Sequence, residues 1–545
     1  MSVARSSLLF AIGTLISRFS GVARESVIGA VFGASIFMDA FVVAFRIPNL
    51  LRELLAEGAL GSSFTKVYSG LCVEDKEAAN RLLIQTLQFV VMVTIAVCAF
   101  GIFFADDLVA LMTLLDSHDP KFNGITVALT QLMFPFIGFA AIGAVVQGAL
   151  YQRGGFFLAG VAPILFNLFS IIGAIWLAPL LRDHLPGEFA DKFGDAGILG
   201  LAVGTLLGGA AQSAIQAWGI WQPLLKNHRL IPRQLPWSKD IRKILILMGP
   251  MVIAASAGQI NVIVNTNFAT SLETGAVTWL YFAFRLVQLP IGMFGVAVGA
   301  AILPTLTKSI TEAHGKVDVK ASREIINAMD LVAWLMIPCT LALVIGSQDL
   351  TRVLYEAGQF GERDTNATAI AIEAYSYGLL GYGILKVMNS YYYATGRTKF
   401  PMAVSIFSIL ANYVANALFV KKFGHQGLAI TASVTLTLNS LLLIAGMSVD
   451  KVQVNWLEIL KSVFLLAIGS VLVLLIYRSY SPLLNSWSLS TLILGQDTTI
   501  LAKKIDALVR LSIATFVIIT IFGAIGLTRI GKTPRQALQM LKRKK

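Results

Sequence analysis

We single out six basic side chains inside apolar stretches that are long enough to cross a membrane. They are Arg18, Arg24, Arg46, Arg52, Arg285 and Lys386. A charge at the centre of a bilayer costs at least ~2.5 kcal/mol, so several charges in neighbouring helices require partners or a water-filled cavity. We therefore expect Arg18, Arg24, Arg52 and Arg285 to line a cavity for an anion, and the arginine fork favours a diphosphate.

The second apolar stretch carries a polar face. Asp39, Arg46, Glu53 and Glu57 recur at offsets that place all four side chains on one side of an α-helix. One interpretation is a cavity wall with a gating role. The alternative is an internal ladder of salt bridges that holds the helix in place. For Glu53 and Glu57 the two interpretations have about equal weight.

Arg285 belongs to a similar polar stripe in the eighth stretch. The stripe consists of Thr278, Arg285, Gln288, Gly292, Gly295 and Gly299. Small residues permit close approach of a ligand, but the alternative for the glycines alone is helix packing within the membrane. Lys386 and Glu373, in the tenth stretch, fit an ion pair, a proton relay or a cavity lining, and the sequence does not distinguish these.

Four oxygen-bearing side chains near the C-terminal third are candidates for an ion site. Asn412 and Asn416 are spaced by one helical turn, as are Thr431 and Thr435 on the next stretch. These oxygens could ligate a sodium ion, but no carboxylate accompanies them. Hydrogen bonding between the two helices is the favoured interpretation.

Composition decides the class of protein. Of the 545 residues, 56% are hydrophobic and only 13% are charged, and the mean hydropathy is +0.75. A water-soluble protein would have about 25% charged residues. The three cysteines and five histidines form no metal-binding spacing, and no phosphate-binding loop is present. We expect neither a cofactor nor a bound metal ion, and the net charge of +13 indicates cytoplasmic loops rather than a nucleic-acid surface.

The apolar stretches predict an all-α polytopic membrane protein with about fourteen transmembrane helices, each of roughly 20 residues. The first stretch is not a signal peptide, because it contains arginines and lacks a small-residue cleavage site. Most lysines and arginines fall in loops on the side of the N-terminus, so both termini are predicted to be cytoplasmic. The expected spans are residues 7–32, 36–60, 82–111, 125–150, 156–180, 196–222, 243–270, 275–306, 326–346, 368–394, 400–420, 427–449, 457–477 and 508–528.

An internal repeat divides the chain. The tripeptide AFR occurs at 44–46 and again at 283–285, and Tyr151, Gly154 and Asn167 resemble Tyr393, Gly396 and Asn412. The repeat predicts two pseudo-symmetric six-helix lobes, residues 1–225 and 226–450, joined by a basic cytoplasmic loop near 223–243. Two extra C-terminal helices within 451–530 and a basic cytoplasmic tail, 531–545, follow. This plan is typical of alternating-access transporters.

Several motifs carry a resemblance to a known family. The segments SRFSGVARESVIGAVFG (17–33), DAFVVAFRIPNLLRELLAEGAL (39–60), WLYFAFRLVQLPIGMFGVAVGAAILPTLTK (279–308) and LYEAGQF (354–360) closely resemble the MurJ (MviN) lipid II flippases. These belong to the multidrug/oligosaccharidyl-lipid/polysaccharide exporter superfamily. The resemblance implies a multi-pass protein of the bacterial inner membrane that moves lipid II, a polyprenyl-diphosphate precursor of peptidoglycan, to the periplasmic leaflet.

The resemblance also implies roles for individual residues. The family's essential cavity arginines fall on Arg18, Arg24, Arg52 and Arg285, and its essential aspartate falls on Asp39. The last two helices are expected to border a hydrophobic groove for the lipid tail. This sequence departs from the family pattern at Phe284, Gln288 and Ala357, and it lacks a carboxylate near Asn416.

Three rival functions remain at this stage. A cation-coupled multidrug exporter, or an exporter of another polyprenyl-linked oligosaccharide, would share the fold, but an arginine-rich cavity does not suit organic cations. A membrane enzyme acting on polyprenyl diphosphate would need a catalytic carboxylate cluster in an outer loop. A purely structural role in division-complex assembly would leave the intramembrane arginines unexplained. We expect a monomer in contact with membrane lipids, and cell-wall synthases are candidate protein partners.

Overall fold

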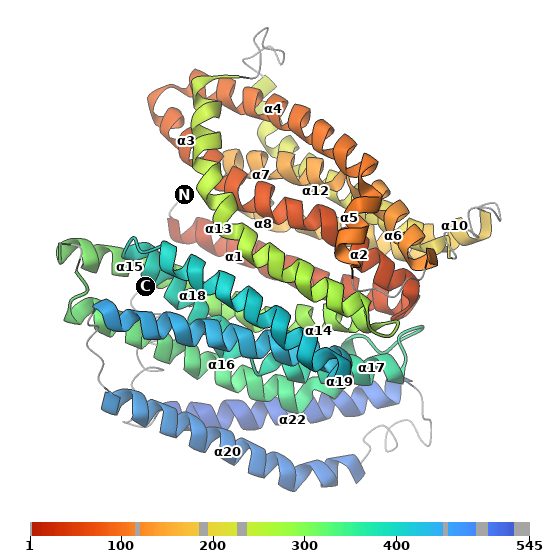
Figure 1. Ribbon diagram of the computed structural model, residues 1–545, viewed down its shortest axis with the longest axis vertical. Helices are drawn as coiled ribbons and strands as arrows, with labels where there is room; N and C mark the ends of the chain where they lie inside the picture. Colours follow the sequence, from red (N-terminus) through yellow and green to blue (C-terminus); the bar gives the residue numbers. More distant parts are fainter. Residues whose placement is uncertain are drawn as a thin grey trace. The chain divides into compact units, whose positions relative to one another are not determined.

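The computed structural model describes residues 3–114, 120–184, 195–225, 237–314, 316–450, 456–486 and 500–527. Every named element in these ranges is a helix (Figure 1). Nine of the described helices are long and apolar enough to cross a membrane. Each of the fourteen expected spans falls on described helices, and α19 (Lys399–Gly446) contains two of them on either side of Gly424, whose φ is 56°. The chain is an all-α polytopic membrane protein.

The described residues form two compact units. The first unit comprises the residues up to 278 together with 357–360, and the second comprises 279–356 together with the residues from 361 onward. The helices of the first unit are α1 (Val3–Phe32), α2 (Ile36–Leu51), η1 (Arg52–Leu60), α3 (Gly61–Glu74), α4 (Lys76–Phe103), α5 (Ala105–Met112), α6 (Pro120–Met133), α7 (Phe136–Gln152), α8 (Phe156–Val161), α9 (Pro163–Ile172), η2 (Gly173–Leu177), α10 (Ala178–His184), α12 (Gly197–Leu225) and α13 (Lys239–Thr270). Helix α14 (Ala276–Pro290) begins in this unit and continues in the second.

The second unit continues with η3 (Ile291–Gly295), α15 (Val296–Glu312), α16 (Val319–Leu354), α17 (Glu362–Ser376), α18 (Leu379–Ala394), α19, η4 (Met447–Asp450), α20 (Trp456–Ser486) and α22 (Ile500–Leu527). The repeat places α13 in the second lobe, whereas α13 packs in the first compact unit. The lobe boundaries therefore stay a prediction. The expected loop near 223–243 lies partly outside the described residues, and the tail 531–545 lies wholly outside them.

Local structure supports the internal repeat. Each AFR helix carries a proline and is followed by a π-helix: Pro48 precedes η1, and Pro290 precedes η3. Gly154 and Gly396, paired by the repeat, both have positive φ, 77° and 70°. A positive φ costs little only at glycine, so the same tight connection is encoded at both positions.

Polar caps and apolar clusters hold the helices in place. Ser35 accepts a hydrogen bond from the Met38 N–H at the start of α2, and Asp75 caps α4 in the same way. In the first unit, Phe64, Tyr68 and Leu83 belong to a buried cluster with residues of α7 and α13. In the second unit, a cluster joins α16 to α20 and α22.

Candidate functional site

Arg24 is a nearly buried arginine on α1. Its side chain is 11% exposed and forms an ion pair with Glu25, whose side chain is 3% exposed. The guanidinium also lies 5.1 Å from the centre of the Phe166 ring. Its Nε is buried without a hydrogen-bond partner. An unsatisfied charged donor is costly inside a protein, which makes Arg24 a candidate for contact with an anionic group.

Arg18 lies two turns before Arg24 and is half-buried. No described residue forms a hydrogen bond or an ion pair with it. One turn of the same helix is fixed by Asn167 of α9, whose amide donates to Ser20 Oγ at 2.8 Å and to the Ser17 carbonyl at 3.2 Å. The helix that carries Arg18 is therefore held rigidly, while the guanidinium keeps its donors for a ligand.

Arg52 stands where α2 passes into the π-helix η1. Its Nε donates to Asn49 Oδ1 at 3.0 Å, and its Nη2 lies 3.7 Å from Glu53 Oε1. The side chain of Glu53 is 43% exposed, so this ion pair is partly screened by its surroundings. A π-helix often occurs at functional positions, because it displaces side chains from the regular α-helical register.

Asp39 is buried and binds the start of α14. Its Oδ2 accepts the Gly275 N–H at 2.6 Å, and its Oδ1 accepts the Thr278 N–H at 2.8 Å and the Thr278 hydroxyl at 2.6 Å. A carboxylate at a helix N-terminus is stabilised by the free N–H groups and by the helix dipole. Asp39 and Thr278, predicted separately from the sequence, thus form one contact.

The polar face of α2 turns toward the segment 259–278. Arg46 donates to Thr266 Oγ1 at 2.5 Å, and Gln259 donates to Glu53 Oε2 at 3.1 Å. Asp39 also contacts this segment, through Gly275 and Thr278. Asp39, Arg46 and Glu53 therefore share one face, as their spacing predicts. Their partners include neutral groups, so the face is more than a ladder of salt bridges. The side chain of Glu57 lies outside the described part of the chain.

Arg285 is held by its own helix in the second unit. Its Nη2 donates to the Tyr281 hydroxyl at 3.1 Å, and its Cζ lies 4.9 Å from the centre of the Tyr281 ring. Gln288, one turn later, is exposed. Because Arg285 belongs to a different compact unit from Arg18, its convergence with the other arginines stays a prediction.

Gly299, beyond Arg285, lies where two helices pack closely. A Cβ at Gly299 would lie 2.9 Å from the Lys386 carbonyl oxygen, and Ser390 donates to the Gly299 carbonyl at 2.8 Å. The helix-packing interpretation therefore accounts for Gly299. Glu373 accepts the Tyr377 hydroxyl at 2.8 Å and has no ion pair with Lys386, both residues being described.

The four candidate ion ligands are paired with one another. Thr431 donates to Asn416 Oδ1, and Thr435 donates to Asn412 Oδ1 at 3.3 Å. All four side chains are buried. These contacts join the two halves of α19 across Gly424, which agrees with the favoured interpretation of hydrogen bonding between helices.

Glu25 and Arg510 are charged groups inside spans that escaped the sequence reasoning. Glu25 is the buried partner of Arg24, and Arg510 of α22 pairs with Asp349 of α16. The signal was present in both cases, since a charged residue within an apolar run requires a partner.

The long apolar helices define a polytopic helical membrane protein. Residues 28–496 match the family described as lipid II flippase MurJ. The chain is 32% identical over 484 residues to the lipid II flippase MurJ of Burkholderia cenocepacia, covering 87% of this chain and 89% of that protein. It is 30% identical to a probable lipid II flippase MurJ of Vibrio cholerae, covering 82% and 83%.

Solved structures agree in fold. A structure of lipid II flippase MurJ in an inward closed conformation matches with a TM-score of 0.69 and 23% identity, covering 94% of this chain and 99% of that chain. An inward-facing multidrug resistance transporter of the MATE family matches with a TM-score of 0.59 and 16% identity, covering 81% and 95%. The chain belongs to the lipid II flippase MurJ family, and it is a flippase rather than an enzyme.

Proposed function

We propose that this flippase moves lipid II from the cytoplasmic to the periplasmic leaflet of the bacterial inner membrane by alternating access. Its relatives carry lipid II in their names. The two repeats would rock about a central cavity, with both termini in the cytoplasm. The even number of expected spans, fourteen, and the excess of basic residues in one set of loops support this arrangement.

The diphosphate of the headgroup would bind Arg18, Arg24, Arg52 and Arg285. The observation that carries this proposal is the unused capacity of the arginines: Arg24 keeps a buried Nε without a partner, and Arg18 has no described partner. Moving a diphosphate through hydrocarbon without such groups would cost many kcal/mol of hydration. A cavity with fixed guanidinium groups replaces that hydration.

Release of the headgroup requires the cavity to bind it more weakly when open to the periplasm. We infer that Asp39 contributes to this step. In the described state its carboxylate is engaged by Gly275 and Thr278. If α14 moves during transport, the freed carboxylate would compete with the diphosphate for an arginine. Arg46 and Gln288 would line the same cavity, and Lys386 is a further candidate.

The polyprenyl tail would stay outside the polar cavity, along the last two helices. Leu508, Leu511, Thr515, Phe516 and other residues of α22 form a shallow surface patch along this helix. The patch is mostly apolar, as a hydrocarbon tail requires. The headgroup and the tail would thus follow separate routes through one protein.

The test is exposure of lipid II on the outer leaflet of cells that lack their own flippase and express this chain. We compare wild type with Arg18→Ala, Arg24→Lys and Arg285→Ala at matched abundance in the membrane. Arg81→Ala is the matched control, because Arg81 is 60% exposed and pairs only with surface carboxylates, Asp75 and Glu77.

Wild type and the Arg81 variant should restore exposure, and the cavity variants should not. Arg24→Lys should fail as well, since lysine keeps the charge but loses the two-pronged geometry. Normal transport by all three cavity variants would exclude the arginine site. Efflux of cationic drugs without any lipid II exposure would instead favour a multidrug exporter.

A further inference from the structure

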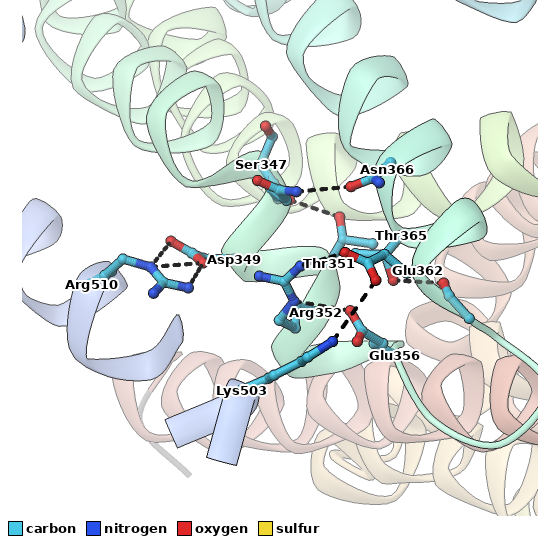
Figure 2. A network of polar contacts seen from close by, with 12 residues as sticks. Ser347, Asp349, Thr351, Arg352, Glu356, Glu362, Thr365, Asn366, Lys503 and Arg510 are labelled. Atoms are coloured by element: carbon cyan, nitrogen blue, oxygen red, sulfur yellow. Dashed lines mark hydrogen bonds and ion pairs between the residues drawn. The ribbon is translucent and has the colours of Figure 1, made fainter. Parts of the chain in front are cut away.

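The guanidinium of Arg24 is held in a different way from that of Arg510. In α22, the Nε of Arg510 donates to Asp349 Oδ2 at 2.9 Å, and Nη2 binds the same carboxylate (Figure 2). Arg24 contacts Glu25 through one nitrogen, Nη2, and its Nε is buried without a hydrogen-bond partner. Adjacent residues of a helix project about 100° apart, so the contact with Glu25 does not by itself fix the orientation of the guanidinium.

An aromatic ring supplies the second contact of Arg24. Its Cζ lies over the Phe166 ring of α9, 5.1 Å from the ring centre. A guanidinium within about 6 Å of a ring centre is attracted by the negative face of the π system, and the attraction is stronger where water is excluded. The Arg24 side chain is 11% exposed, so the contact is largely shielded from solvent. The guanidinium is therefore held from two helices, by Glu25 of α1 and by Phe166 of α9.

The Phe166 ring is itself fixed by two other rings. Its centre lies 5.6 Å from that of Phe136 of α7 and 6.3 Å from that of Phe45 of α2. The Phe45 and Phe136 rings lie 5.2 Å apart, so the three rings form one cluster. Aromatic pairs at these distances attract each other beyond the effect of burial. A rotation of Phe166 away from Arg24 would disturb its contacts with both neighbours.

Two adjacent glycines of α12 allow this cluster to pack. A Cβ at Gly208 would lie 2.8 Å from the Phe166 carbonyl oxygen, and a Cβ at Gly209 would lie 2.7 Å from Cδ2 of the Phe136 ring. Ser170 donates to the same Phe166 carbonyl at 2.8 Å. Only glycine permits such close approach of two helices without displacement of one of them. The backbone of Phe166 and the ring of Phe136 are thus both fixed by α12.

The register between α1 and α9 is fixed next to Phe166. Asn167 donates to Ser20 Oγ at 2.8 Å and to the Ser17 carbonyl at 3.2 Å. Ser20 lies one helical turn before Arg24. These hydrogen bonds keep Arg24 opposite Phe166, because a sliding movement of α1 along α9 would break both of them.

We propose that Phe166 is a positioning residue for Arg24, and that its ring sets the orientation in which the guanidinium meets the diphosphate of the headgroup. This inference rests on the proposed function. A guanidinium binds phosphate oxygens through two nitrogens only when its plane has a defined direction. Without the ring, Glu25 alone would hold the group, and the guanidinium would be free to turn.

The experiment measures the dissociation constant of lipid II for the purified protein in detergent micelles. Phe166→Leu and Phe166→Met remove the ring with little change of volume, and Phe166→Tyr keeps it. Phe166→Leu is also combined with Arg24→Ala. The matched control is Phe32→Leu, because the Phe32 ring lies 5.6 Å from the Cζ of Arg182, an arginine outside the proposed headgroup site.

Phe166→Leu and Phe166→Met should each raise the dissociation constant by about three- to tenfold, and Phe166→Tyr should stay within about twofold of wild type. The Phe32→Leu control should bind like wild type. In the Arg24→Ala background, Phe166→Leu should cause no further loss, because the ring then has no guanidinium to hold. If Phe166→Leu does not fold, Phe166→Met carries the same comparison.

Two results would overturn the positioning role. One is wild-type affinity after removal of the ring, and the other is an equal loss of affinity with and without Arg24, which would mean that Phe166 acts through packing alone. A failure of the proposed function would look different. In that case wild type would not bind lipid II, or Arg24→Ala would bind it as tightly as wild type does.

Discussion

Asp39→Asn gives the sharpest test of how α14 is held. The carboxylate of Asp39 accepts three hydrogen bonds from Gly275 and Thr278, and the residue is 5% exposed. Asparagine has one oxygen and one NH₂ group in place of the two oxygens. Whichever way the amide turns, its NH₂ faces at least one N–H donor of α14. The substitution also removes the negative charge from the N-terminus of the helix.

The cost follows from these losses. A hydrogen bond to a charged group contributes about 1.5–3 kcal/mol, and a buried donor left unsatisfied costs about 1–3 kcal/mol. The charge at a helix terminus adds up to ~2 kcal/mol in a partly buried site. Because these contributions overlap, we expect Asp39→Asn to lower the free energy of unfolding by about 2–4 kcal/mol.

The measurement is unfolding of the purified protein in mixed micelles by titration with a denaturing detergent. Asp318→Asn is the matched control: Asp318 caps α16 through one hydrogen bond, from the Ala321 N–H at 2.8 Å. Asparagine and aspartate are similar caps there, so the control should differ from wild type by less than about 0.5 kcal/mol. Equal stabilities for the two variants would refute the assigned role of the Asp39 carboxylate.

Three further predictions concern other contacts. Gly358→Ala should lower the melting temperature strongly, because φ at this position is 54° and the added Cβ would overlap a backbone oxygen of α1. The control Gly361→Ala should not lower the melting temperature, because a Cβ at Gly361 would lie in open space. Burial opposes ionisation of Asp195, but hydrogen bonds from Arg182 and a backbone N–H hold the pKa of this carboxyl below its usual value. The ionised Asp195 therefore stabilises the fold above about pH 4, and this contribution is lost as the pH falls through the lowered pKa. The melting temperatures of wild type and Asp195→Asn should converge in acid. A difference that stays constant with pH would contradict this. Thr431→Val should cost about 1–2 kcal/mol in the detergent titration and leave transport equal in sodium and potassium buffers; a selective loss in sodium would indicate an ion site instead.

The sequence singled out the candidate site residues, because a charge in a membrane is conspicuous. Arg18, Arg24, Arg52 and Arg285 were identified by residue type and position alone, since few arginines are tolerated in hydrocarbon. The shared face of Asp39, Arg46 and Glu53 followed from helical spacing. The contact partners of these residues could not be predicted from the spacing. Nothing in the sequence indicates that Asp39 binds the start of α14, or that Arg46 donates to Thr266, some 220 residues later.

The sequence by itself determined that this protein is helical, spans a membrane repeatedly and carries charged side chains within its apolar stretches. Those properties depend on composition and on periods of a few residues, which are local. Only the tertiary structure decided which charges are already neutralised, as Arg510 is by Asp349, and which keep free donors, as Arg24 does. Neutralisation depends on distances of a few ångströms between side chains far apart in the chain, and these are set by how the helices pack.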